Sequence, residues 1–185
     1  MRIIAGEFSS RSIKTLKGNS TRPTLDKVRE AVFSSLGGFF DGGVMLDLYS
    51  GSGAVGIEAI SRGMDKAYLV DKNREAIGII KENVNSLHIE DKTKVLCMPD
   101  AKALQYFIEH QIKFDLVYLD PPYVLQQNEK VITILDENHL LNDGARIVVE
   151  CLKEDQNFEQ KNDIEKYKEA VYGITRIVYY RKVNH

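Results

Sequence analysis

The sequence predicts an α/β fold with a doubly wound, mainly parallel sheet of seven strands that ends in an antiparallel hairpin. Three observations predict this fold. From residue 44 onward, short apolar runs alternate with segments of helical periodicity. These runs lack a polar residue at every second position, which is typical of strands covered by helices on both faces. A glycine-rich loop joins the first run to a helical segment, as in many nucleotide-binding folds.

The elements follow in order along the 185 residues. Residues 1–22 are predicted to form a short basic β-hairpin or arm, and residues 23–185 one main domain. The main domain begins with a helix that has Thr24 at its N-cap position. Further helices are predicted at Ala54–Arg62, Arg74–Ser86, Ala101–His110 and Asn128–Glu137. Strands are predicted at Val44–Tyr49, Lys66–Asp71, Thr93–Met98, Phe114–Leu119, Ala145–Cys151, Lys166–Tyr172 and Thr175–Lys182, the last two forming the hairpin.

Charge is unevenly distributed along the chain. The net charge is −2, yet residues 1–30 hold seven basic and three acidic residues. A basic segment on an acidic body fits either a polyanionic partner or a solvated surface, and charge alone does not separate the two. No apolar run reaches the length of a membrane span, and the N-terminus lacks the apolar core of a signal peptide. We therefore expect a cytoplasmic protein, and we expect it to be a monomer.

No metal site is predicted. Cys97 and Cys151 lie in apolar, strand-like runs, and we expect them to be buried, reduced thiols. No cluster of cysteine and histidine accompanies them, so the pattern of a zinc site is missing from the sequence.

The loop Gly51-Ser52-Gly53-Ala54-Val55-Gly56 follows a predicted strand and begins a predicted helix. In that context a GxGxxG pattern favours a nucleoside-containing cofactor, because its backbone can approach a ligand closely. Asp71 lies 20 residues after Gly51, at the end of the next strand, where a carboxylate can hold a ribose hydroxyl. The loop by itself does not distinguish NAD from S-adenosylmethionine.

Two further carboxylates have two interpretations each. Asp47 lies within the end of the first predicted strand, where it could reach a cationic cofactor or brace the loop. Asp100 follows the third strand, where it could accept a hydrogen bond from an adenine amine or cap the helix beginning at Ala101.

The tetrad Asp120-Pro121-Pro122-Tyr123 directly follows a predicted buried strand. Two prolines cannot continue a strand, so the chain turns at the carboxyl end of the sheet, where open α/β sheets bind ligands. A carboxylate, rigid carbonyl groups and an aromatic ring at that turn suit a planar exocyclic amine, such as the NH2 group of a nucleobase.

Together these motifs resemble the Rossmann-like, S-adenosylmethionine-dependent methyltransferases that act on amino groups, whose catalytic motif is similar to the tetrad. Within that class the chain is similar to the bacterial RsmD family, which methylates N2 of a guanine in 16S ribosomal RNA. The similarity is carried by residues 1–6, 22–33, 47–59, 70–73, 120–123 and 172–176. Of these, residues 22–33 are the most specific to the family. The chain departs from the family at Pro99, often Gly, and at Cys151, often His.

The resemblance implies a guanine-N2 methyltransferase with S-adenosylmethionine as cofactor and ribosomal RNA, free or in an assembling small subunit, as partner. Asp120 and the Pro121 carbonyl would hold the target amine, Pro122 would keep the loop rigid, and Tyr123 would stack on the base. The implied cofactor-binding residues are Asp47, Tyr49, Gly51, Gly53, Asp71, Lys72, Asn73, Asp100 and Ala101.

Other readings stay open at this point. An adenine-N6 methyltransferase of DNA or RNA would use the same tetrad, and a dinucleotide-dependent oxidoreductase would use the same glycine loop. Candidates for contact with RNA are Arg2, Arg11, Arg22, Thr24 and Arg29, with solvent exposure as the alternative for each.

Overall fold

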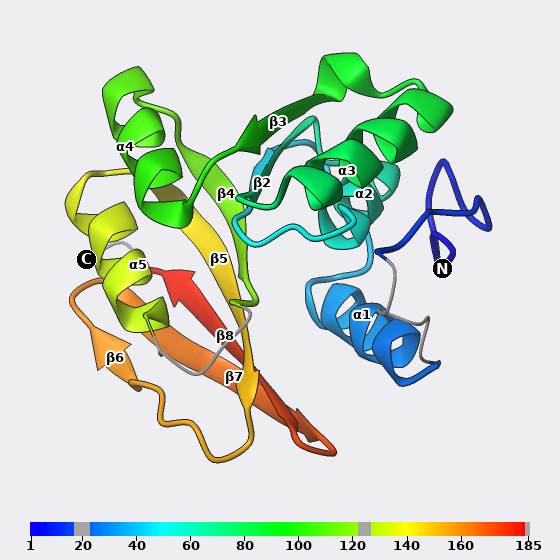
Figure 1. Ribbon diagram of the computed structural model, residues 1–185. Coiled ribbons are helices and arrows are strands. Elements are labelled where there is room, and N and C mark those ends of the chain that lie inside the picture. Colours follow the sequence, from blue (N-terminus) through cyan, green and yellow to red (C-terminus); the bar gives the residue numbers. More distant parts are fainter. Residues whose placement is uncertain (17–22, 122–126, 184–185) are drawn as a thin grey trace.

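The computed structural model describes residues 1–16, 23–121 and 127–183, with the side chains of residues 23–25 excepted (Figure 1). Its centre is an eight-stranded sheet in the order β3-β2-β1-β4-β5-β8-β7-β6. Strands β1 to β5 are parallel, and β8, β7 and β6 are antiparallel to their neighbours. The strands are β1 Val44–Asp47, β2 Lys66–Asp71, β3 Thr93–Cys97, β4 Phe114–Leu119, β5 Leu141–Leu152, β6 Gln160–Lys161, β7 Ile164–Tyr172 and β8 Thr175–Lys182.

The prediction of a mainly parallel sheet with a closing antiparallel hairpin is confirmed, but the count of seven strands is wrong. The additional strand, β6, has only two residues, Gln160 and Lys161, paired with the start of β7 at the edge of the sheet. A strand of that length has no periodicity to detect.

Helices cover both faces of the sheet, as Figure 1 shows. Helices α1 to α3 pack on one face, and α4 and α5 pack on the other, so the doubly wound arrangement is confirmed. Thr24 lies within α1 rather than at its cap. The helices are α1 Pro23–Ser35, α2 Ala54–Ser61, α3 Arg74–Leu87, α4 Asp100–His110 and α5 Asn128–Glu137, with a short 3-10 helix at Glu90–Lys92.

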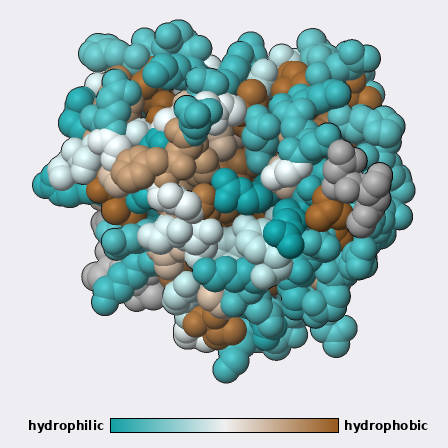
Figure 2. Space-filling view, turned by 180° about the vertical axis from the view of Figure 1, so that it is seen from behind, coloured by the Kyte–Doolittle hydropathy of each residue, from teal (hydrophilic) through white to brown (hydrophobic). Residues whose placement is uncertain are grey.

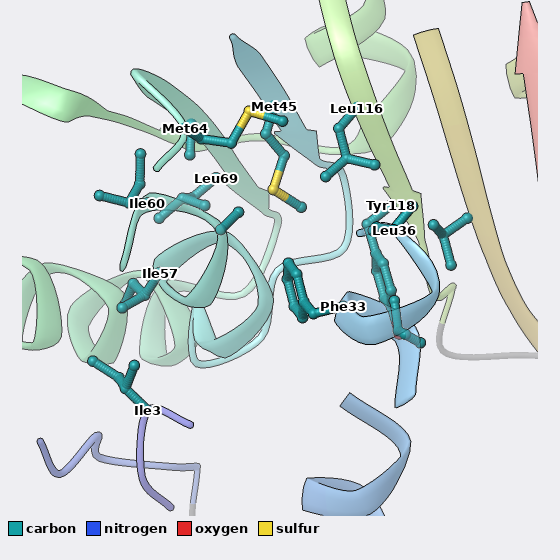
Figure 3. Packing of buried hydrophobic residues seen from close by; sticks show 14 of the residues in the cluster. Ile3, Phe33, Leu36, Met45, Ile57, Ile60, Met64, Leu69, Leu116 and Tyr118 are labelled. Atoms are coloured by element: carbon teal, nitrogen blue, oxygen red, sulfur yellow. The ribbon is translucent and has the colours of Figure 1, made fainter. Parts of the chain in front are cut away.

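The core divides into two layers, one on each side of the sheet. Figure 3 shows the layer under α1 and α2, where Phe33 of α1 and Leu36, the residue after α1, approach Met45 of β1 and Tyr118 of β4. These side chains are nearly or fully buried. Such burial supplies most of the free energy that fixes the strand ends, and therefore the site, relative to the helices.

The N-terminal segment, predicted as a short hairpin or arm, packs onto the body. Within residues 1–16 one isolated antiparallel bridge joins Arg2 and Ser12, and no strand forms. Ile3 and Ile13 are buried. The Glu58 carboxylate accepts hydrogen bonds from the backbone of the segment, so its position depends on α2.

The two cysteines differ in how far they are exposed. Cys97 is exposed, so the expectation of a buried thiol is wrong, because β3 is the edge strand of the sheet and is covered less completely. Cys151 is half-buried.

The face seen in Figure 2 is mostly hydrophilic, with hydrophobic residues in separate patches. Within the described residues, no helix is long and apolar enough to cross a membrane.

Candidate active site

The carboxyl ends of β1, β2, β3 and β4 meet at one cavity of about 880 Å³. That size lies within the range of roughly 300–1,000 Å³ that is usual for small-molecule sites. The cavity brings together eight of the residues predicted from the sequence: Tyr49, Gly51, Asp71, Lys72, Asn73, Asp100, Asp120 and Pro121. Other residues lining it are Leu16, Leu48, Ala76, Met98, Pro99 and Gln127.

The glycines of the loop have separate roles. Gly51 has a φ of +60°, and a Cβ built on it would meet no protein atom within 4 Å. Because Gly51 lines the cavity, its bare backbone leaves room there for a ligand. A Cβ on Gly56 would stand 2.1 Å from Leu69 Cδ2, so this glycine allows α2 to pack closely on β2. Gly53 starts α2 at a φ of +85° and is not one of the residues lining the cavity.

Asp71 is held in a fixed orientation at the end of β2. Its two carboxylate oxygens accept hydrogen bonds from the backbone N–H of Gly51 and of Asn73, each at 2.9 Å. Asn73 in turn caps α3 by accepting from the Glu75 N–H at 2.8 Å. A carboxylate has about four acceptor positions. Asp71 therefore keeps capacity to accept hydroxyl groups from a ligand in the cavity.

Tyr49 and Asp100 close another side of the cavity. The Tyr49 hydroxyl donates to one Asp100 oxygen at 2.8 Å, and the Ala101 N–H donates to the other at 2.8 Å. Burial, and then the hydrogen bond to Asp100, raises the pKa of Tyr49, so the phenol stays a donor at neutral pH. Asp100 is itself the first residue of α4, which the prediction began at Ala101. Ala101 acts through its backbone and does not line the cavity.

Asp47 does not line the cavity, contrary to its assignment as a cofactor-binding residue. It is buried and accepts hydrogen bonds from the Ser50 hydroxyl at 3.0 Å and the Gly56 N–H at 3.2 Å. Burial raises the pKa of Asp47 to about 7, and these two hydrogen bonds oppose the shift. Asp47 therefore braces the glycine loop from beneath, which is the other role that the sequence left open.

Asp120 has an acidic neighbour that the sequence did not indicate. Glu150 of β5 accepts a hydrogen bond from the Tyr118 hydroxyl at 2.6 Å and lies near enough to the Asp120 side chain to act on it electrostatically. Burial and then the charge of Glu150 raise the pKa of Asp120 well above its ordinary value. Asp120 is accessible from the cavity, so solvent weakens the effect of burial, and we regard the contact with Glu150 as the firmer cause.

The register of the sheet explains why Glu150 was missed. Val149 pairs with Leu119, so the next residues of the two strands, Glu150 and Asp120, are neighbours. The nearest signal in the sequence is an acid at the penultimate position of a predicted apolar strand.

The structure separates the residues proposed for RNA contact. Arg29 is buried, and its guanidinium lies 3.6 Å from Glu58, so it is a structural residue and its assignment to an RNA surface is corrected. Arg2 and Arg11 are exposed, and they donate to the carbonyls of Ser10 and Ser86. Pro122, Tyr123, Arg22 and the side chain of Thr24 lie outside the described residues.

Comparisons with known proteins agree with this arrangement. Residues 1–181 match the model of a family described as "Conserved hypothetical protein 95". "Ribosomal RNA small subunit methyltransferase D" of Haemophilus influenzae is 31% identical over 154 residues, which is 83% of this chain and 80% of that protein. The chain belongs to the RsmD family. "Putative rRNA methyltransferase YlbH" of Bacillus subtilis is 37% identical over 182 residues, 98% of this chain and 99% of that protein.

The solved structures agree at the level of the fold. A structure described as a putative methyltransferase, yhhF, from Escherichia coli superposes with a TM-score of 0.85 at 26% identity, covering 100% of this chain and 99% of that one. Membership of the RsmD family confirms the predicted methyltransferase class, with S-adenosylmethionine as its cofactor. The oxidoreductase reading is thereby set aside.

Proposed function

We propose that the protein transfers a methyl group from S-adenosylmethionine to the exocyclic N2 amine of a guanine in small-subunit ribosomal RNA. The observation that supports this most directly is the position of Asp120. Its carboxylate stands at the same cavity as the glycine loop and Asp71, so an amine bound to it would adjoin the cofactor. Relatives named as ribosomal RNA methyltransferases match most of this chain.

The residues at the cavity fit the cofactor. The bare backbone of Gly51 would receive its main chain, the Asp71 carboxylate would accept from its ribose hydroxyls, and Asp100 would accept from its adenine amine. When bound, S-adenosylmethionine supplies a methyl group on a positively charged sulfur. Lys72 and Asn73 border the same space.

The charge of the site suits a cationic cofactor. Within the described residues, Asp71, Asp100, Asp120 and Glu150 form no ion pair with lysine or arginine. Negative charge that the protein does not neutralise lowers the energy of a positive group placed nearby.

Asp120 and Pro121 would position the target amine. The Asp120 carboxylate and the Pro121 carbonyl each accept one N–H, which directs the nitrogen lone pair toward the methyl carbon. Transfer of the methyl group from the sulfur to the nitrogen would leave one N–H proton to be lost, and Asp120 would take that proton. A carboxylate with a raised pKa is a better acceptor for that proton than an ordinary aspartate. Pro122 and Tyr123 keep the roles that the sequence suggests, rigidity of the loop and stacking on the base.

Labelled methyl transfer tests this proposal. Small ribosomal subunits from a strain that lacks the corresponding gene would be incubated with the protein and labelled S-adenosylmethionine, and the RNA digested and analysed by mass spectrometry. We expect N2-methylguanosine at one position. N6-methyladenosine would overturn the choice of base, since an adenine amine satisfies the same acceptors, and no incorporation would overturn the activity. Parallel reactions with protein-free RNA would show which form is the substrate.

A further inference from the structure

Exposed apolar side chains gather at the end of the β7–β8 hairpin. Among the described residues, the exposed large hydrophobic side chains are Phe39, Leu152, Val171 and Ile174. Leu152 is the last residue of β5, and Val171 and Ile174 lie at the hairpin end. Ile174, in the turn, is 74% exposed. The hairpin extends beyond the body of the domain in Figure 1. A cluster of this kind on a polar surface is a signal for an interaction site.

The register places part of this cluster next to the catalytic residues, while Val171, which pairs with Arg176, faces the other side of the hairpin. Leu152, Thr175 and Tyr172 pair across β5, β8 and β7 and form a row that we call the distal row. Two residues back along each strand, Glu150, Ile177 and Ala170 form the neighbouring row.

Both rows point to one face of the sheet, because side chains two residues apart share a face. Glu150 contacts Tyr118 and Asp120, so that face is the one on which Asp120 lies. Two strand residues span roughly 7 Å. The distal row is therefore one pleat beyond the row that contains Glu150.

The hairpin end is held rigidly. The Lys153 N–H donates to the Ile174 carbonyl at 2.8 Å, which continues the ladder past the end of β5. Arg176 donates to the Lys153 carbonyl at 2.7 Å and lies 3.1 Å from Glu169. A surface fixed in this way loses little conformational entropy when it binds a partner.

We propose that the distal row and Ile174 form a docking surface for unpaired bases that flank the target base in the substrate RNA. The proposal rests on the proposed function. Stacked nucleotides are spaced about 3.4 Å apart along one strand. A base two or three nucleotides from one held at Asp120 would thus reach this surface.

The chemistry of the surface favours bases over phosphates. Tyr172 packs against the core and is half-buried, so it offers an aromatic ring that is already held in place, and Leu152 and Ile174 add aliphatic contact. Flat apolar faces suit the stacking of unpaired bases, which dominates recognition of single-stranded RNA. Charge at the hairpin end is not positive, because Lys153 and Arg176 are matched by Glu154, Asp155 and Glu169.

Binding and turnover of matched variants test the proposal. Tyr172→Ala and Ile174→Ser would be compared with Tyr172→Phe, which keeps the ring. Phe39→Ser serves as a control. Phe39 is 63% exposed but precedes the amino end of β1, whereas the cavity lies at the carboxyl end of that strand. We expect Tyr172→Ala to bind small subunits about tenfold or more weakly, since base–aromatic stacking is worth roughly 1–3 kcal/mol. Tyr172→Phe and Phe39→Ser should match the wild type.

Two readouts exclude a merely structural effect. Affinity for S-adenosylhomocysteine, measured by calorimetry, should stay unchanged in every variant. The dependence of RNA affinity on salt should also keep its slope, because a stacking contact releases no counterions. Wild-type affinity in both Tyr172→Ala and Ile174→Ser would overturn the proposal.

Cross-linking identifies the partner. A photoreactive p-benzoylphenylalanine in place of Ile174 should cross-link to ribosomal RNA within a few nucleotides of the modified base. Cross-linking only to a ribosomal protein, or no cross-link at all, would overturn the proposal. If the wild type binds subunits but transfers no methyl group, the proposed function fails, and the binding and cross-linking results still decide whether RNA docks on this surface.

Discussion

Two groups of acids in this protein, one buried and one beside the cavity, differ in which groups balance their negative charge. Glu58 is fully buried, and it receives Arg62 at 2.8 Å, Arg29 at 3.6 Å and the backbone N–H groups of Ile4 and Ala5. In the described part of the chain, Asp47, Asp120 and Glu150 form no ion pair with lysine or arginine. Tyr118 donates to Glu150, while Glu150 and Asp47 both raise the pKa of Asp120.

The difference separates a structural cluster from a functional one. A buried charge is costly unless it is paired, so around Glu58 the fold supplies the partners and joins the N-terminal segment, α1 and α2. Around Asp120 the fold leaves negative charge near an open cavity. We infer that a bound cationic cofactor and the target amine balance this negative charge, as arginine does at Glu58.

The largest effect is expected at Glu58. Glu58→Gln leaves the buried guanidinium group of Arg62 without its counter-ion and Arg29 with only the partly exposed Asp26, which should lower the free energy of unfolding by about 3–5 kcal/mol. Urea denaturation measures this. Glu82→Gln is the control, because the pair of Glu82 with Lys14 is exposed and such pairs contribute less than about 1 kcal/mol. Equal losses in the two variants would contradict the structural role of Glu58.

Asp120→Ala should act on turnover and not on the fold. Removal of a group that stabilises developing charge typically costs about 100- to 1,000-fold in rate. We therefore expect methyl transfer to fall by at least this factor, while calorimetry shows little change in affinity for S-adenosylhomocysteine. Turnover within a few-fold of the wild type would rule out the role assigned to Asp120.

Asp47 should make stability depend on pH. Because its pKa in the folded protein is raised to about 7, the folded state binds the proton more tightly than the unfolded state between about pH 4 and 7. Its contribution to stability is complete below pH 4 and is lost as pH rises through 7. Asp47→Asn keeps an oxygen that accepts from Ser50 and Gly56 but removes the group that titrates. The unfolding free energy of this variant should therefore change less between pH 5 and pH 8 than that of the wild type. Equal changes would show that Asp47 does not titrate in this range.

The smallest effect is expected from Glu150→Gln. The charge of Glu150 raises the pKa of Asp120, so removing it should lower that pKa. Asp120 would then stay ionised at lower pH, and the acid limb of the kcat/KM profile should move in the same direction. An acid limb at the wild-type position, or one displaced to higher pH, would contradict the coupling of these two residues.

Local patterns explain why much of the fold was predictable. Runs such as Phe114–Leu119 are apolar throughout, and β4 has those bounds. The proline pair that follows forbids a longer strand, so the place of Asp120 at the end of β4 was correctly predicted. Asp71 was predicted at the end of the second strand and lies there, where it also accepts a hydrogen bond from Gly51.

The amino-acid sequence alone determined the order of strands and helices, the position of the cavity at the carboxyl ends of the strands, and several residues that line it. Each of these depends on periodicity or backbone restriction over a few neighbouring residues. Only the tertiary structure decided which charged groups meet. Glu150 reaches Asp120 through the register of β4 and β5, and Arg29 turns inward to Glu58 across 29 residues of chain. Such contacts follow from how distant elements pack, and burial then sets the energy of each charge.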